Sequence, residues 1–194
     1  MASERVRPYH HGDLRRALLR ATIEVIAERG PSAVSMREVA RRAGVSHAAP
    51  AHHFGDKAGL LTAVATEGFT LLAESLRGAQ ERTGEFLEIG VAYVRFAVSN
   101  RAHFALMFRP DLYRADDPQL VAAKQAAARF LYGPAAAASG RRAGRGRDAG
   151  IAAWSLVHGF ATLLLDGNLP PAARRDPEAA ARRAASHLFG AHRG

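Results

Sequence analysis

The stretch Ser35–Lys57, SMREVARRAGVSHAAPAHHFGDK, predicts two short helices joined by a tight turn. Ser35 and Glu38 have the spacing of a capping box, in which each side chain satisfies a backbone amide of the first helical turn. This helix can run for only about two turns before Gly44, and Ser46 is placed to cap the second helix. The pattern favours a helix-turn-helix unit that binds DNA, with a plain helical hairpin as the alternative.

Pro50 lies inside the expected second helix and raises the question of whether the segment is helical at all. With Ser46 as the N-cap, Pro50 is the fourth helical residue, where the first true backbone hydrogen bond is lost. A proline in the middle of a helix costs roughly 3 kcal/mol, and one at this margin should cost less. Starting the helix one residue later, or a 3₁₀ first turn, would remove most of that cost. We therefore interpret the segment as a recognition helix whose first turn is tightened.

The start of this helix carries small side chains that allow close approach to DNA base edges. Ala48 and Ala49 can contact a thymine methyl group, and His47 can donate a hydrogen bond to a purine acceptor. Residues 1–57 hold ten of the 27 Lys and Arg and five of the nine His, against six acids. With a net charge of +9 for the whole chain, this distribution favours a nucleic acid as the partner.

Several other classes of protein are excluded by the sequence. The 194 residues include no cysteine, so disulfides, thiolate zinc sites and a cysteine nucleophile are absent. His47, His52 and His53 lack the offsets of a zinc site, and there is no Gly-x-Ser-x-Gly elbow or dinucleotide-binding loop. We expect no metal, no cofactor and no catalytic residue. The most apolar run, Ile151–Leu165, is shorter than the ~20 residues of a membrane span, and no secretory signal is visible, so we expect a cytoplasmic protein.

The rest of the chain shows helical spacing of apolar residues and no period-two strand pattern. Asp56 is expected to cap a long helix that runs to about Arg82, and Gly133–Arg147 is expected to be a loop. We predict an all-α fold of about nine helices, with a three-helix head at residues 1–56 and a helical domain at residues 57–194. The other helices are expected at Asp13–Glu28, at 86–100, at 101–108, at Pro118–Tyr132, at Asp148–Leu165 and at Pro177–Phe189.

Two segments make the chain resemble the TetR family of transcriptional regulators. MREVARRAGVSHAAPAHHFGDKAGLL, with the preceding YHHGDLRRALLRATIEVIAERGPSAVSM, is similar to the family's N-terminal domain. AAWSLVHGFATLLLDG looks like the Trp-His-Gly motif of one group of C-terminal domains, carried here by Trp154, His158 and Gly159. The resemblance implies a homodimeric repressor whose last two long helices pair as a four-helix bundle, so that two heads bind a palindromic operator. A small-molecule effector in the C-terminal domain would then release the DNA.

The resemblance also assigns roles within the head. Phosphate contacts are expected at two helix N-termini, where backbone amides favour anions. The family usually has a phosphate-binding tyrosine where this chain has Ala51, and His52 can replace that hydroxyl, more strongly when protonated. We therefore expect weaker and more pH-dependent DNA binding than is usual for the family. Separately, Arg7, Tyr9 and His10 form an N-terminal arm that can either contact DNA or remain a free tail. The expected DNA contacts are Ser35, Arg37, Ser46, His47, Ala48, Ala49, His52 and Lys57.

Large side chains of the second domain are the candidates for a ligand pocket, with ordinary core packing as the alternative. Trp154 and His158 are four residues apart and share a helix face, and a hydrogen bond from His158 to a neighbouring helix is favoured over ligand binding. Leu164 and Leu165 are expected to face a second subunit, along with Leu188 and Phe189. A dimer that binds a small molecule but no longer recognises DNA remains the alternative function. The candidate pocket residues are Tyr93, Phe96, Phe104, Met107, Phe108, Trp154 and His158.

Overall fold

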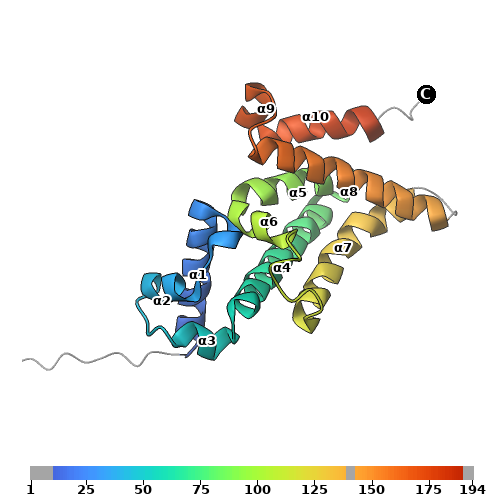
Figure 1. Cartoon of the computed structure of the whole chain (residues 1–194). Helices are drawn as coiled ribbons and strands as arrows, with labels where there is room; N and C mark the ends of the chain where they lie inside the picture. Colours follow the sequence, from blue (N-terminus) through green and yellow to red (C-terminus); the bar gives the residue numbers. More distant parts are fainter. Residues whose placement is uncertain (1–10, 139–142, 190–194) are drawn as a thin grey trace, which may run out of the picture.

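The computed structural model describes residues 11–138 and 143–189, with side chains for residues 14–133 and 147–187, and over that range the chain is all-α (Figure 1). Helices α1–α3 form a head at one end of the long helix α4, and the later helices pack along and beyond its other end. The elements are α1 (His11–Arg29), η1 (Pro31–Ala33), α2 (Met36–Arg42), α3 (Ala49–Phe54), α4 (Lys57–Thr83), α5 (Phe86–Ser99), α6 (Arg101–Met107), α7 (Pro118–Ala138), α8 (Ala143–Leu165), α9 (Pro171–Arg175) and α10 (Pro177–Phe189).

Helix α4 runs from the head into the second domain and contacts α1, α3, α5, α6 and α7. The predicted cap is confirmed, because the Asp56 carboxylate accepts a hydrogen bond of 2.8 Å from the Gly59 amide. Gly84 ends the helix with a φ of 68°, a left-handed conformation that glycine adopts without strain. The residues that α4 buries recur every three or four positions, as an apolar helix face requires. They are Leu60, Leu61, Thr62, Val64, Ala65, Gly68, Phe69, Leu72, Ala73, Leu76 and Ala79.

A single hydrophobic core extends through both ends of the molecule. Leu18 and Val25 of α1 belong to the same cluster of buried side chains as Leu61 of α4, Tyr93 of α5 and Leu120 of α7. Each fully buried side chain of this size contributes about 1.5–3 kcal/mol relative to exposure. The core therefore crosses the predicted boundary at residues 56–57, and the head is held to the second domain by packing as well as by the chain.

The predicted loop at Gly133–Arg147 is wrong over most of its length. Helix α7 continues to Ala138 and α8 begins at Ala143, while residues 139–142 lie outside the described part. The alanines of this segment have the highest helix propensity of any residue, and they outweigh the glycines that suggested a loop. Helix α9, between the last two long helices, was also missed. The described residues therefore form ten α-helices where about nine were expected.

Helix α8 passes the length and composition test for a membrane span over Arg147–Leu165, with a mean hydropathy of 1.3. The expectation that no segment would do so was wrong, because it counted only the apolar run from Ile151 and left out the helical residues before it. In the fold α8 packs against α5, α7 and α10. Within the subunit 28% of this window is buried, so α8 has one packed face and one outward face.

Two glycines of α4 give opposite predictions for the free energy of unfolding. A Cβ atom at Gly59 would clash with the backbone carbonyl of Phe54, whereas one at Gly78 would meet only the flexible guanidinium of Arg82 at 3.1 Å. Gly59→Ala should destabilise the protein by about 1–3 kcal/mol through overpacking. Gly78→Ala should stabilise it by about 0.5–1 kcal/mol through helix propensity.

Urea unfolding of the two variants and the wild type measures both changes. Both substitutions put the same side chain into the same helix, so the comparison reports the close contacts at Gly59, which are the Phe54 carbonyl and the flexible Arg114 guanidinium. A Gly59→Ala protein as stable as Gly78→Ala would contradict the close approach of the Phe54 carbonyl.

Candidate nucleic-acid interface and interior pocket

Helix α2 is capped by a serine and held to α1 by a network of carboxylates and guanidinium groups. The Ser35 hydroxyl accepts a hydrogen bond of 3.2 Å from the Glu38 amide, which confirms the first half of the predicted capping box. The Glu38 carboxylate accepts instead from the guanidinium groups of Arg41, at 2.8 and 2.9 Å, and Arg42, at 2.9 Å. These hydrogen bonds lower the pKa of Glu38 to about 2. Arg42 also donates to Glu28 of α1, so the network fixes α2 against the first helix.

The turn after α2 has a specific backbone geometry. Gly44 has a φ of 66°, its amide donates to Arg41 at 3.2 Å, and the Val45 amide donates to Ala40 at 3.0 Å. This pair of hydrogen bonds is a Schellman motif, which ends a helix and sends the chain off at a defined angle. The glycine predicted to end α2 therefore also sets the direction in which α3 is presented.

The start of α3 differs from the prediction. The helix begins at Ala49, its N-cap position is Ala48, and no side chain caps it, so the expected Ser46 cap is wrong. The Ser46 carbonyl accepts from the Ala49 amide at 3.0 Å, which closes a three-residue turn of the 3₁₀ kind before the helix. Pro50 is consequently the second helical residue, where an amide would have no partner within the helix. The tightened turn is confirmed, and the proline is buried and removes no helical hydrogen bond.

Most of the expected DNA contacts lie on the surface of the head. Ser35, Arg37, Ser46, His47, Ala48 and His52 are exposed, and Ala49 is half-buried. Lys57 is also half-buried, and its ammonium donates a hydrogen bond of 2.8 Å to the Ser32 carbonyl, which fixes the start of α4 to the turn before α2. Ala51 is exposed beside His52, on the helix that would enter a groove. Arg7, Tyr9 and His10 lie outside the described residues.

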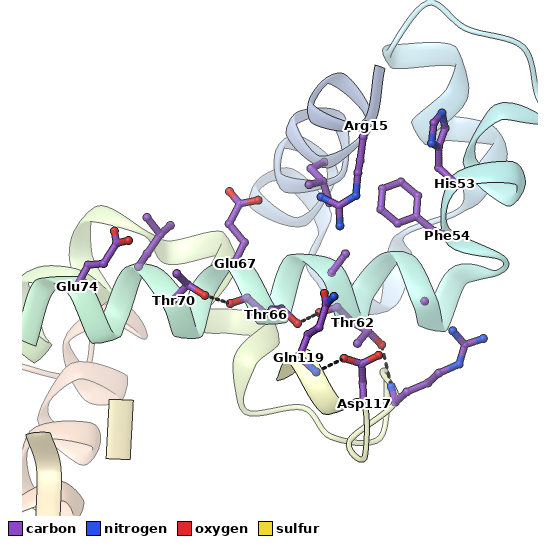
Figure 2. Close-up of a pocket in the computed structure, with 15 residues that line it drawn as sticks. Arg15, His53, Phe54, Thr62, Thr66, Glu67, Thr70, Glu74, Asp117 and Gln119 are labelled. Carbon is purple, nitrogen blue, oxygen red and sulfur yellow. Dashed lines mark hydrogen bonds between the residues drawn. The ribbon is translucent and has the colours of Figure 1, made fainter. Parts of the chain in front are cut away.

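A groove lies where the head meets the second domain, along α4, and we call it the junction groove (Figure 2). It has a volume of about 510 Å³ and runs from Phe54 of α3 to the start of α7. At the α3 end, the Arg15 guanidinium lies over the Phe54 ring, 5.4 Å from the ring centre. Hydrogen bonds join several of the polar groups in the groove. The Arg114 amide donates to the Thr62 hydroxyl at 3.0 Å, and the Asp117 carboxylate accepts from the first amides of α7. The groove is therefore a polar joint between the head and the second domain.

Aromatic side chains from α5, α6 and α8 form a cluster deep in the second domain. The Tyr93 hydroxyl lies 2.8 Å from His158 Nδ1 and accepts from the Trp154 indole at 3.4 Å. Burial raises the pKa of Tyr93 and lowers that of His158, so both groups stay neutral near pH 7. Phe104 and Phe108 pack against His158 with ring centroids at 5.4 and 4.5 Å. The predicted hydrogen bond from His158 to a neighbouring helix is thus confirmed.

Beside this cluster is a cavity of about 420 Å³, which we call the aromatic pocket. Of the candidate residues, Met107, Phe108 and Trp154 line it, while Phe104 and His158, again with Phe108, line a separate cavity of about 480 Å³. Tyr93 and Phe96 are buried and line neither of these two cavities. The other residues around the aromatic pocket are Phe69, Leu72, Pro110, Tyr113, Lys124, Ala127, Ala128, Leu131 and Tyr132.

Lys124 is a pocket residue that the sequence reasoning missed. It lies on α7 between Leu120 and Ala127, four and three residues away, and both of these are buried. A single basic residue on the apolar face of a predicted helix was the available signal.

The outward face of α8 presents exposed apolar side chains. Ile151 and Leu163 are 45% and 46% exposed, and Gly159 lies between them with open space where a Cβ would be. Leu164 was expected to face a partner but is 5% exposed and packs inside the subunit, so Leu163 holds the outward position instead. The side chains of Leu188 and Phe189 lie outside the described residues.

Two models of known protein families match this chain. Residues 86–188, just over half the chain, match the model described as the tetracyclin repressor-like C-terminal domain. Residues 18–64 match the model of bacterial regulatory proteins of the tetR family. The chain belongs to the TetR family. The TetR family consists of regulators, not enzymes, and its C-terminal match contains Trp154, His158 and Gly159 of the motif noted in the sequence.

This TetR-family chain is also similar to individual proteins in sequence and in structure. A solved protein of unknown function from Rhodococcus sp. RHA1 is 35% identical with a TM-score of 0.76, covering 94% of this chain and 96% of that one. The HTH-type transcriptional regulator BetI of Rhizobium meliloti (strain 1021) is 34% identical over 111 residues, 56% of this chain and 47% of BetI. The HTH-type transcriptional repressor Rv3405c of Mycobacterium tuberculosis (strain H37Rv) is 46% identical over 48 residues, 25% of this chain and 26% of its own. The aligned regions span less than half the length of these curated relatives.

The Glu38 network gives a pH-dependent prediction for the stability of the head. The pKa of the Glu38 carboxyl group lies near 2, below its ordinary value of 4.5. The stabilisation from the ionised carboxylate is therefore complete above about pH 4.5 and declines as the pH falls towards 2. Glu38→Gln keeps the shape but removes the charge. It should lower the melting temperature at pH 7, and its difference from the wild type should shrink as the pH falls below 4.5.

Thermal unfolding by circular dichroism across this pH range measures the difference. Glu81→Gln is the matched control, because its ion pair with Arg77 on α4 is exposed and should contribute little at any pH. A Glu38→Gln difference that stays constant with pH would show that the carboxylate's charge is not what stabilises α2.

Proposed function

We propose that this TetR-family protein is a DNA-binding transcriptional repressor that a small-molecule effector releases from a palindromic operator. The observation that carries the proposal is the exposed start of α3, which follows a Schellman turn on a head braced by the Glu38 network. A helix presented in this way enters a major groove with its N-terminal residues against the bases. The head matches the tetR-family model, and the chain is similar to the transcriptional regulators named above, which supports the same interpretation.

The division of labour within the head follows from the exposure of its side chains. His47 and Ala48 lie exposed in the turn before α3, where their side chains can contact the edges of the bases. Arg37 stands at the start of α2, where a guanidinium can bind a phosphate and fix the register of the head on the duplex. Ser35 and Lys57 hold the helix starts in place through the hydrogen bonds described above, and they add phosphate contacts as a second role.

The protein acts as a homodimer in this proposal, paired through α8 and α10. The apolar residues Ile151 and Leu163 on the outward face of α8 supply a surface that a second copy covers, and Gly159 between them allows close approach of a facing helix. A two-fold pair presents two α3 helices to two half-sites, which is why the operator is expected to be palindromic.

The function is tested by selecting bound duplexes from a random DNA pool and titrating the selected duplex against salt. A palindromic site whose affinity falls steeply with salt supports the proposal, because each phosphate contact releases counterions. A folded dimer that selects no site would instead favour a small-molecule-binding protein whose head no longer recognises DNA.

The affinity for the selected operator should depend on His52. Its ring can donate a hydrogen bond to a phosphate where the family usually has a tyrosine, and the His53 ring lies 5.5 Å away, edge-on. We expect His52→Ala to bind the operator roughly fivefold more weakly than the wild type in fluorescence anisotropy, because it loses this hydrogen bond. His53→Ala is the neighbouring control and should bind like the wild type. Equal affinity of His52→Ala and the wild type would refute the role of His52.

The dimer surface is tested by placing a charge on it. Leu163→Asp should weaken self-association by roughly 100-fold or more, because the two-fold axis would bury unpaired carboxylates from both copies. Ala122→Asp, on the exposed face of α7, is the control and should leave the dimer intact. Sedimentation equilibrium measures both, and a Leu163→Asp protein that dimerises like the wild type would show that copies pair elsewhere.

A further inference from the structure

The aromatic pocket contains one charged side chain among the residues that line it. That side chain is Lys124, whose ammonium lies 5.6 Å from the ring centre of Phe69 and 5.0 Å from that of Tyr113. It makes no ion pair and no hydrogen bond with any residue that the structure describes. A half-buried ammonium with only ring faces beside it has lost part of its hydration without gaining a counter-ion.

The energetics of this arrangement favour an anion in the pocket. Burial lowers the pKa of Lys124, because partial desolvation disfavours the charged form of its amine. The two rings attract the ammonium through their electron-rich faces, but they do not neutralise its charge. A carboxylate beside the ammonium would supply the missing counter-ion and form a charge-assisted hydrogen bond, which is stronger than one between neutral groups.

Two other polar side chains around the pocket are already hydrogen-bonded within the protein. The Tyr113 hydroxyl donates to the Met107 carbonyl at 2.6 Å, and the Trp154 indole donates to Tyr93. The remaining wall consists largely of apolar and aromatic groups, among them Phe69, Leu72 and Phe108. Lys124 is therefore the group best placed to orient a ligand by charge, while the rings and aliphatic side chains would hold its body.

We propose that the effector is an amphipathic anion, with an aromatic or otherwise apolar body in the aromatic pocket and a carboxylate bound by the Lys124 ammonium. This inference rests on the proposed function, because it takes the aromatic pocket to be the effector site. A volume of about 420 Å³ suits a small organic acid. A cationic ligand would meet the repulsion of the ammonium, and a neutral one would leave the ammonium without a counter-ion.

The probe for this proposal is 4-phenylbutanoate, compared with its neutral amide and with 4-phenylbutylamine. Trp154 is the only tryptophan of the chain and lines the pocket, so its fluorescence reports binding directly. We expect the carboxylate to bind the wild-type dimer at least tenfold more tightly than the amide, and the amine to bind most weakly. Lys124→Met keeps the length of the side chain but not its charge, and should abolish the preference for the carboxylate.

Two further variants make the result specific to this ammonium. Lys124→Arg should retain the preference, and Arg129→Met, which removes a positive charge from the exposed side of α7, should leave it unchanged. Equal binding of the carboxylate and the amide by the wild type, a preference that survives Lys124→Met, or failure of the carboxylate to bind would overturn the proposal.

The selected operator separates this inference from the proposed function. A protein that binds the operator but shows no preference for the carboxylate retains the proposed function and loses this inference. A protein that prefers the carboxylate but selects no DNA keeps the ligand class, and its function lies elsewhere. Release of the operator by 4-phenylbutanoate in the wild type, and not in Lys124→Met, supports both.

Discussion

Burial of helix α4 is the constraint on which the rest of the structure depends. Its apolar face recurs from Leu60 to Ala79, and helices from both ends of the chain pack against it. Such a face cannot be exposed to water without losing a large part of the stability of the fold. The head, the aromatic pocket and the junction groove are therefore all positioned by a single helix. A structural change at any one of them is transmitted along α4.

Local chemistry made the ends of several helices predictable from the sequence. Ser35 and Asp56 cap α2 and α4 as expected, because their oxygens satisfy amides that would otherwise lack a partner. The family match confirms the resemblance that the head motif and the Trp-His-Gly segment carried. Ser46 was a plausible cap by the same rule, but the chain closes a 3₁₀ turn there. Pro50 thereby becomes the second helical residue, where it removes no helical hydrogen bond.

The pocket could not be predicted in the same way, because its shape depends on how distant helices meet. Tyr93 has the size of a pocket residue but is fully buried and hydrogen-bonded to His158. Lys124 has the charge of a surface residue but faces the aromatic pocket from an apolar helix face. Leu163 and Leu164 are neighbours in sequence and have similar side chains, yet only the fold shows which of them points outward.

The length of α4 has a mechanical consequence. A continuous helix of 27 residues is about 40 Å long and behaves as a rod, because its backbone hydrogen bonds resist bending. Phe69 and Leu72, where α4 borders the aromatic pocket, lie near the middle of this rod, about 18–23 Å from the end that touches α3. Tilting α4 by about 5° around this point would move that end by roughly 2 Å, about half the rise of one base pair. A rearrangement of side chains at the pocket that tilts α4 would therefore also displace α3.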